Sequence, residues 1–551
     1  MSAAAPPVIE NRRHQMFPTL EPVEIERMRR FGEVRTYRAG EALARAGERA
    51  PGLTIILSGK LEITRRDEAG RSVLIVSHGP GEFTGELAQL AGRPTLVDAI
   101  AAEPLEGLII PPDRLRALLI AEADLGERIM RALILRRVGL LETGAGGPII
   151  VGRPDNGDVL RLQGFLRRNG HPHVRLNPET DAAAKALIER FHVDAGQLPI
   201  VLCPGGQLLR NPSESELARC IGLVGPIDPQ RVYDVAVVGA GPAGLAAAVY
   251  AGSEGLSTLV LDCRAFGGQA GASARIENYL GFPTGITGMA LMARAYNQAQ
   301  KFGVEMAIPD EVKSLEPSAG PNGTFVLKLS NNERANARAV VVASGARYRR
   351  LDVANLEAFE HSSVHYWASP LEAKLCAGQE VALVGAGNSA GQALVYLASQ
   401  VAKVWLLVRG PSLEASMSHY LVDRIRGLAN VEVVLGAQVS GLEGDNGMLT
   451  AIRWRQAGRE TQRAIRHLFL FIGADPNTDW LNGSGVALDA KGFVLTGAEA
   501  GDGRRPMETS RGGVFAIGDV RAGSVKRVAA AVGEGAQVVA TLHAALAAPH
   551  A

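Results

Sequence analysis

Two glycine-rich segments constrain this chain most, because each stands between a run typical of a buried strand and a run typical of a helix. The first, DVAVVGAGPAGLAAAVYAGSEGLSTLVLD, contains Gly239, Gly241 and Gly244, and Asp262 closes its second apolar run. Glycines in this pattern allow a tight turn, a close approach of the backbone to a pyrophosphate, and close packing of helix on strand. The terminal acid is placed to accept from ribose hydroxyls. The segment predicts a dinucleotide-binding strand–helix–strand unit.

The second segment, VALVGAGNSAGQALVYLASQVAKVWLLVRG, has Gly385, Gly387 and Ala390 in the three loop positions. Counting 23 residues from Gly385, the spacing between Gly239 and Asp262, reaches Val408, and Arg409 follows at once. Loss of the acid and gain of a cation favour a nucleotide with a 2′-phosphate, which is NADPH rather than NADH. The preference is modest, and NADH stays open.

The length and charge of the chain limit the number of domains and the classes of partner that it can have. At 551 residues it is too long for one hydrophobic core, so three or more units are expected. Lys and Arg number 58 against 57 Asp and Glu, which leaves a formal charge of +1 and no field to hold a nucleic acid. The N-terminus has no apolar signal segment, and no run of about 18 apolar residues occurs. We expect a cytoplasmic protein without a membrane span.

Residues 1–142 alternate short apolar runs with glycine turns and end in a helical pattern over 112–137, which predicts a β-roll closed by helices. The loop GPGEFTGELAQLAGRPTLVDAIA resembles the phosphate-binding cassette of cyclic-nucleotide-binding domains, in Phe83, Gly85, Glu86 and Leu87. Thr95 stands where that family has its phosphate-binding arginine, and Arg93 lies two residues early. A displacement of two residues points the arginine side chain in another direction. We therefore expect the fold of a cyclic-nucleotide-binding domain without ligand binding, and binding of a cyclic nucleotide is the alternative. The candidate residues for it are Gly85, Glu86, Arg93 and Thr95.

Residues 143–229 predict the order strand, helix, strand, helix, hairpin and helix. This order, with Pro199 opening the hairpin, resembles a glutaredoxin/thioredoxin-like fold in which that proline is cis. The loop after the first strand, GRPDNGD, lacks the Cys-x-x-C that such domains carry. We therefore expect a docking or spacer module without thiol exchange.

The region from 230 onward resembles thioredoxin reductase, a class II pyridine nucleotide-disulfide oxidoreductase. The resemblance rests on GGQA (267–270), IENYLGFP (276–283), VVASGA (341–346), FIGADPNT (471–478), GVFAIGDV (513–520) and GSVKRVAAAVGEG (523–535). It implies a flavoprotein with two Rossmann-like dinucleotide-binding domains, an FAD domain over 230–348 and 473–551 and an inserted NAD(P)H domain over 349–472. It also implies a homodimer, and a closing helix that Gly533 opens.

By this resemblance, each cofactor has a set of candidate residues. Those for FAD are Gly239, Gly241, Pro242, Ala243, Gly244, Asp262, Gly268, Gln269, Asn278, Ala343, Gly345, Gly518, Asp519, Lys526, Arg527 and Val528. Those for NADPH are Gly385, Gly387, Asn388, Ser389, Ala390 and Arg409.

The redox Cys-x-x-C of thioredoxin reductases is absent. Trp367 and Pro370 stand where its two sulfurs belong, and neither is a nucleophile or an electron carrier. The NADPH-to-flavin step needs only the cofactors in place. We therefore expect an NAD(P)H-dependent flavin oxidoreductase that passes electrons to an acceptor other than its own dithiol. The alternatives are a thioredoxin-disulfide reductase acting directly at the flavin, and a redox or nucleotide sensor working through the N-terminal domain.

The chain has four cysteines, Cys203, Cys220, Cys263 and Cys376, with no two spaced as a redox pair or a zinc knuckle. In a reducing compartment such residues act as small buried apolar side chains, although a long-range disulfide stays open. Cys376 is expected to pack at a helix end. No metal site is expected.

Overall fold

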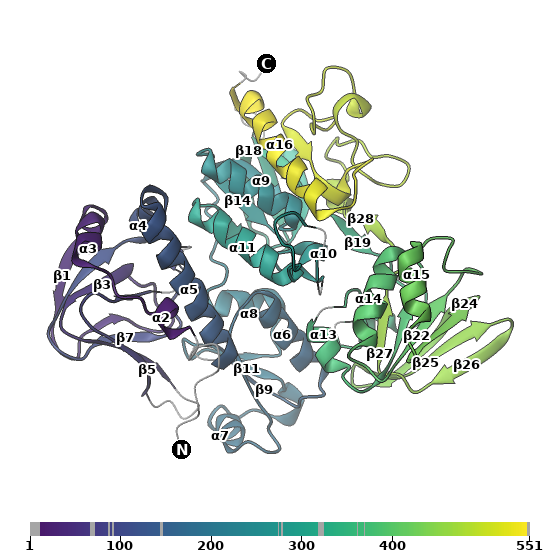
Figure 1. Cartoon of the computed structure of the whole chain (residues 1–551), viewed down its shortest axis with the longest axis horizontal. Coiled ribbons are helices and arrows are strands. Elements are labelled where there is room, and N and C mark those ends of the chain that lie inside the picture. Colours follow the sequence, from purple (N-terminus) through teal and green to yellow (C-terminus); the bar gives the residue numbers. More distant parts are fainter. Residues whose placement is uncertain are drawn as a thin grey trace.

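A computed structural model describes residues 12–66, 72–85, 89–90, 93–143, 147–273, 275–276, 279–317, 324–360, 362–368 and 370–547. With the boundaries expected from the sequence, we refer to these residues as the roll domain (12–143), the middle domain (147–229), the first dinucleotide domain (230–348 and 473–547) and the second dinucleotide domain (349–472). In Figure 1 the middle domain lies between the roll domain and the second dinucleotide domain, below the first. Among the helices of the described residues, none combines the length and apolar character needed to cross a bilayer.

The roll domain consists of two four-stranded antiparallel sheets, ordered β1-β8-β3-β6 and β2-β7-β4-β5. The expected helical tail is two helices, α4 and α5, which break at Glu122. Their apolar faces pack on the first sheet around Leu53, Phe83 and Leu115. The strands are β1 (Glu33–Tyr37), β2 (Ala42–Ala44), β3 (Leu53–Ser58), β4 (Leu61–Arg66), β5 (Ser72–His78), β6 (Phe83–Thr84), β7 (Asp98–Ala101) and β8 (Leu105–Ile110). The helices are α2 (Arg13–Met16), α3 (Pro22–Met28), η1 (Arg29–Phe31), α4 (Pro112–Ala121) and α5 (Ala123–Thr143).

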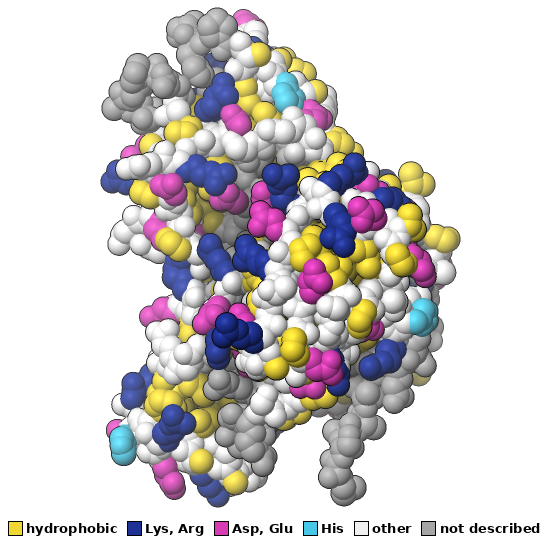
Figure 2. All heavy atoms as spheres, turned by 90° about the vertical axis from the view of Figure 1, so that its left-hand side faces the viewer, with side chains coloured by type: hydrophobic (Ala, Val, Ile, Leu, Met, Phe, Trp, Pro, Cys, Tyr) yellow, Lys and Arg dark blue, Asp and Glu magenta, His cyan; other side chains and the backbone are white. Residues whose placement is uncertain are grey.

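Figure 2 shows one face of the molecule, the left-hand side of Figure 1. Lys and Arg side chains are interspersed with Asp and Glu side chains over this face, with no large field of one sign. The distribution agrees with the near-zero net charge of the sequence.

The middle domain has the predicted order of elements around the sheet β10-β9-β11-β12. Strand β10 is parallel to β9, whereas β11 is antiparallel to it, and the Leu198–Pro199 peptide is cis as predicted. Helix α6 begins where Asn156 accepts from the amides of Asp158 (2.9 Å) and Val159 (3.1 Å). The elements are β9 (Ile149–Val151), α6 (Gly157–Arg168), β10 (Val174–Leu176), α7 (Ala182–Arg190), η3 (Ala195–Gln197), β11 (Ile200–Leu202), β12 (Leu208–Arg210) and α8 (Glu214–Cys220).

The first dinucleotide domain contains a seven-stranded sheet ordered β15-β14-β13-β18-β17-β16, with β29 paired to β18. Strand β13 is a nearly continuous apolar run, as expected of a parallel strand with both faces covered. The strands are β13 (Val232–Val238), β14 (Thr258–Leu261), β15 (Glu305–Ala307), β16 (Val312–Pro317), β17 (Phe325–Leu329), β18 (Arg334–Val342) and β29 (Val514–Ala516). The helices are α9 (Pro242–Ser253), α10 (Gly268–Gly271), α11 (Gly288–Lys301), η4 (Asp479–Leu481), η5 (Gly497–Ala500), η6 (Gly518–Val520) and α16 (Val528–Ala547).

The second dinucleotide domain has a parallel sheet ordered β20-β27-β21-β22-β23 and an antiparallel sheet ordered β24-β25-β26. Strands β19 (Ala346–Tyr348) and β28 (Ala474–Pro476) pair antiparallel where the chain enters and leaves this domain. Its strands are β20 (Val364–His365), β21 (Glu380–Val384), β22 (Lys403–Val408), β23 (Val431–Leu435), β24 (Ala437–Asp445), β25 (Met448–Gln456), β26 (Arg459–Arg463) and β27 (His467–Leu470). Its helices are α12 (Leu356–Phe359), α13 (Pro370–Leu375), α14 (Asn388–Ala398) and α15 (His419–Arg426).

The structure corrects the expectation for the cysteines. Cys203 and Cys220 form a disulfide, Cys263 is exposed, and Cys376 is buried directly after α13, as expected. The sequence spacing of 17 residues hid the pair, because the β11–β12 hairpin and α8 bring its ends together only after folding. The middle domain therefore lacks a Cys-x-x-C but does not lack a sulfur pair.

Candidate functional site

The three glycines of the first loop have three different environments. Gly239 has φ +114°, and a Cβ there would stand 2.2 Å from the Ala343 carbonyl oxygen. A Cβ on Gly244 would stand 1.8 Å from the Gly239 carbonyl oxygen, so the helix packs on the turn. Gly241, which precedes α9, has the Gly268 Cα, at 3.9 Å, as the nearest such neighbour. Gly239 and Gly244 are therefore required for the turn and for the packing of the helix on it. Gly241 instead leaves space at the N-terminus of α9, and helix N-termini bind anions favourably.

The GGQA segment folds against this loop. The Gly267 amide donates to the Ala240 carbonyl at 2.7 Å, and Gln269 donates from Nε2 to the Ala346 carbonyl at 2.8 Å. The Gly345 carbonyl, directly before β19, accepts from the Asn477 amide, directly after β28, at 3.0 Å. The predicted residues Gly268, Gln269, Ala343 and Gly345 thus line the same edge of the sheet as the loop.

The Gly518–Asp519 turn reaches this edge from the C-terminal end of the chain. A Cβ on Gly518 would stand 2.9 Å from the Ala243 Cβ. The turn is held by Glu534, a buried residue of α16 that accepts from the Gly518 amide and from Arg521, both at 2.6 Å. The sequence prediction missed Glu534, although a carboxylate within the apolar run AAAVGEGAQVVA was a usable signal.

Near this turn, burial raises the pKa of Asp519, while Lys526 opposes the shift and Glu534 adds to it. Lys526 donates from Nζ to the Asp519 carbonyl at 3.2 Å, and both Lys526 and Arg527 are exposed. Helix α16 begins at Val528, so the expectation that Gly533 opens it is wrong. The small residues AAA after Val528 continue the helix without a break.

Asp262 is the acid predicted to bind ribose. Its carboxylate accepts from the Ala240 amide at 2.9 Å and from the Arg264 amide at 3.0 Å. Burial raises its pKa, and these backbone bonds oppose the shift. Asp262 therefore ties the glycine loop to the end of β14, and its role toward ribose stays a prediction.

The second loop repeats this geometry. Gly385 has φ +148°, and a Cβ there would meet the Phe471 carbonyl oxygen at 2.4 Å, whereas a Cβ on Gly387 would meet nothing within 4 Å. Asn388 accepts through Oδ1 from the Ser418 amide at 2.8 Å. Ser389 is exposed in the first turn of α14, Ala390 is buried beneath it, and Arg409 is exposed directly after β22.

Trp367, at the position where the sequence resemblance led us to expect a redox cysteine, lies in an aromatic cluster between domains. Its ring centroid lies 6.3 Å from that of Tyr348, which stacks on Tyr366 at 5.7 Å. The guanidinium of Arg168, at the end of α6 in the middle domain, lies 4.9 Å from the Trp367 ring centroid. Figure 1 shows α6 beside α13, which Pro370 begins. Burial, and after it the charge of Asp519, raises the pKa of Tyr348.

The cassette of the roll domain faces the other domains. Arg93 donates to the Tyr296 hydroxyl of α11 at 2.5 Å, and Thr95 is buried with its hydroxyl 3.3 Å from the Val97 carbonyl. Gly85 has φ +144°, and its carbonyl accepts from the buried Arg136 at 3.1 Å. Glu86 and Asn278 lie outside the described residues.

Comparison with known proteins gives the family. The model of the pyridine nucleotide-disulphide oxidoreductases matches residues 233–535, more than half of the chain. This chain belongs to the pyridine nucleotide-disulphide oxidoreductase family. The model of the cyclic nucleotide-binding domain matches residues 34–122, so the oxidoreductase part follows a domain of that type.

Two relatives of this oxidoreductase indicate its branch of the family. It is 31% identical over 313 residues to the F component of the alkyl hydroperoxide reductase from Escherichia coli, and the match covers 56% of this chain and 58% of that one. It is 32% identical to the thioredoxin reductase of Mycolicibacterium smegmatis, covering 56% of this chain and 94% of the relative. The chain thus spans little more than half of the first relative's length.

The solved structures agree. The thioredoxin reductase of T. acidophilum has a TM-score of 0.50 and 28% identity, and the match covers 57% of this chain and 99% of that one. The thioredoxin reductase of Lactococcus lactis gives 0.50 and 26% with the same coverage. The two-domain dinucleotide fold predicted from the sequence is confirmed.

The cofactors of thioredoxin reductase-like oxidoreductases are FAD and NADPH. The residues present fit both cofactors. Gly241 and Gly387 each precede a helix of eleven or twelve residues, and a Cβ at either position would meet no atom closer than 3.9 Å. Each helix N-terminus therefore has space beside it for a pyrophosphate.

Proposed function

We propose that this oxidoreductase transfers electrons from NADPH through FAD to an acceptor other than an internal dithiol. The observation that carries the proposal is Trp367, which takes the place of a redox cysteine and is packed between Tyr348 and Arg168. A tryptophan fixed between two domains leaves no thiol to relay electrons.

The residues of this chain position the two nucleotides. The N-terminus of α9 with Gly241 would hold the FAD pyrophosphate, and the N-terminus of α14 with Gly387 would hold that of NADPH. Arg409 would pair with a 2′-phosphate, since guanidinium groups match phosphate geometry. NADH could bind to the same residues without the contact between Arg409 and a 2′-phosphate, so the preference for NADPH over NADH would be modest.

When bound, the flavin supplies the hydride chemistry, and the protein supplies placement and shielding. The half-buried rings of Tyr348, Tyr366 and Trp367 would shield the junction of the two dinucleotide domains from water. Burial raises the pKa of the phenols of Tyr348 and Tyr366, so both stay protonated at neutral pH. Lys526 and Arg527 would place positive charge along the flavin edge.

Anaerobic stopped-flow mixing with NADPH tests the proposal. We expect bleaching of the flavin absorbance, followed by reoxidation with a quinone, ferricyanide or dioxygen. Full FAD content without bleaching would refute an NADPH reductase. Turnover in a thioredoxin-coupled thiol assay would instead support the disulfide reductase and contradict a different acceptor.

We further propose that the roll domain does not bind cyclic nucleotides. Arg93 is engaged by Tyr296, and the hydroxyl of Thr95 turns back onto its own chain, so neither is directed at a phosphate. Calorimetric titration of the full chain with cyclic AMP and cyclic GMP should give no heat of binding. Heat from either nucleotide would overturn this part.

The assembly and location are proposed by analogy. We propose a cytoplasmic homodimer, with the domain boundaries stated from the sequence. Light scattering after gel filtration should give twice the mass of 58.1 kDa. A monomer mass would contradict the dimer without affecting the reductase.

A further inference from the structure

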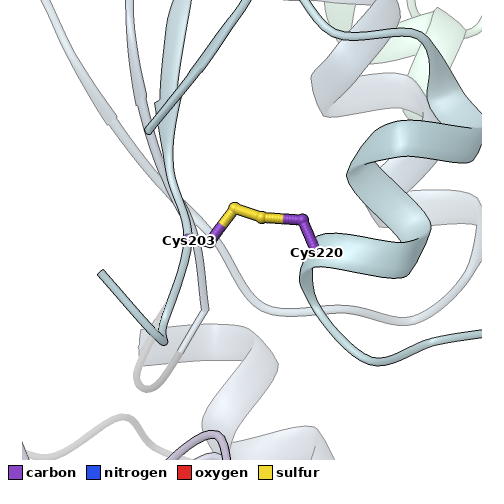
Figure 3. Close-up of a disulfide and its surroundings, with 2 residues drawn as sticks. All are labelled: Cys203 and Cys220. Atoms are coloured by element: carbon purple, nitrogen blue, oxygen red, sulfur yellow. A yellow bond between two sulfur atoms is a disulfide. The ribbon is translucent and has the colours of Figure 1, made fainter. Parts of the chain in front are cut away.

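The Cys203–Cys220 disulfide lies away from the place where thioredoxin-like folds carry their dithiol. Cys203 follows β11, and Cys220 is the last residue of α8, with a Cα–Cα distance of 6.1 Å (Figure 3). The loop after β9, where the fold would carry a Cys-x-x-C, has no sulfur. The domain thus keeps a two-electron sulfur pair at a second position.

The two cysteines differ in accessibility. Cys203 is 4% exposed, whereas Cys220 is half-buried. In thiol–disulfide exchange an incoming thiolate attacks a sulfur that it can reach and expels the other. Because Cys220 is the more exposed residue, its sulfur would be the point of attack and Cys203 the leaving group.

The disulfide lies beside two contacts with the roll domain. A Cβ on Gly222, two residues after Cys220, would stand 2.5 Å from Pro94 of the cassette. A Cβ on Gly47, whose amide donates to the Thr95 carbonyl, would stand 3.8 Å from Gly205, two residues after Cys203. Each half of the disulfide therefore lies two residues from a contact with the roll domain, at Pro94 of the cassette and at Gly47.

A third contact joins the disulfide to the first dinucleotide domain. Arg219, adjacent to Cys220, pairs with the buried Asp310 at 3.0 Å and with Glu333 at 3.4 Å. The Asp310 amide donates to the Asp262 carbonyl at 2.8 Å, and the Asp262 carboxylate accepts from the glycine loop at Ala240. A continuous set of bonds thus runs from the end of α8 to the predicted pyrophosphate loop.

We propose that Cys203–Cys220 is a thiol–disulfide exchange site whose reduction loosens the contacts of the middle domain with Pro94 and Asp310. The substrate class is a dithiol reductant. Its first thiolate forms a mixed disulfide with Cys220, and Cys203 leaves as a thiolate that takes a proton. The second thiolate then attacks the mixed disulfide and releases Cys220, so two electrons pass to the protein and the reductant leaves oxidised.

Reduction removes the covalent link between the hairpin and α8. The end of α8 is then held by the turn at Gly222, where the Leu223 amide donates to Ala218 at 2.8 Å, and by Arg219. The inference does not depend on flavin reduction, and it adds a redox-responsive site to the proposed reductase.

The test uses the full chain isolated without reductant and equilibrated with graded ratios of reduced to oxidised dithiothreitol. Thiols are trapped by alkylation and assigned by peptide mass, with Cys376 as the buried internal control. Hydrogen exchange is followed in peptides covering 93–97 and 308–312. We expect the pair to reduce in the native state, with protection in both segments falling at least tenfold, and to recover on reoxidation.

A matched pair of variants completes the test. The double variant Cys203→Ser/Cys220→Ser should show the hydrogen exchange of the reduced parent at every dithiothreitol ratio. Cys263→Ser, which keeps the disulfide, should change its hydrogen exchange with the dithiothreitol ratio as the parent does. Reduction only after unfolding, two free thiols in the freshly isolated protein, or unchanged exchange in both segments would each overturn the proposal. If the double variant does not fold, the titration of the parent decides alone.

Discussion

Gly387→Ala offers the sharpest test of the second nucleotide loop. Gly387 has φ −86° and ψ 174°, which alanine adopts without strain, and its Cβ would meet nothing within 4 Å. The free energy of unfolding should therefore change by less than about 0.5 kcal/mol. The added methyl group takes the space expected for the pyrophosphate. Losing one backbone hydrogen bond to a charged oxygen costs about 1.5–3 kcal/mol, or about 10- to 150-fold in Kd.

The assay is an anaerobic NADPH titration combined with a thermal melt. Gly385→Ala is the matched contrast, because its φ of +148° and the 2.4 Å approach to Phe471 predict a fall of several degrees in Tm. Gly427→Ala, where the nearest contact would be an ordinary 3.5 Å, is the control in the same domain. An unchanged Kd in Gly387→Ala, or a loss of Tm equal to that of Gly385→Ala, would refute the assignment.

Three further predictions concern positions outside this loop. Glu534→Gln weakens two charge-assisted bonds, including that to the Gly518 amide, so FAD should dissociate about tenfold more readily, measured by flavin fluorescence on dilution. Arg168→Ala removes a cation–π contact of about 0.5–2 kcal/mol, and the Trp367 emission should shift to the red; an unshifted spectrum would contradict the contact. Burial raises the pKa of Asp310 to about 6, so the native state holds this proton more tightly than the unfolded chain does. Ionisation of Asp310 therefore lowers the stability of the parent as the pH rises from about 4 to 6. Thermal melts over this range should show the Tm difference, Asp310→Asn minus parent, increasing with pH.

Much of the site was predictable because local patterns encode it. The spacing at 239–244 and 385–390 requires turn geometry within a few residues, and in the structure each loop runs into the first turn of a helix. The alternation of elements in the middle domain was confirmed for the same reason, since each strand and helix carries its own apolar period.

Contacts across domains were not predictable. Arg168 on Trp367, Arg93 on Tyr296 and Arg219 on Asp310 each join residues about 90 or more positions apart. From a single sequence, each of these arginines is expected to be a solvent-exposed charge. Its contact partner becomes known only when the packing of the domains is known.

By itself, the sequence determined that this chain contains two glycine-rich loops, a roll and a thioredoxin-like order of elements, and that no two of its cysteines are spaced as Cys-x-x-C. These properties are local, because turn geometry, apolar period and residue identity act within short segments. The tertiary structure decided which cysteines meet, which carboxylate holds the Gly518 turn, and what covers Trp367. Those outcomes depend on how separate elements pack, and residues far apart in sequence meet only when the whole chain has buried its apolar surface.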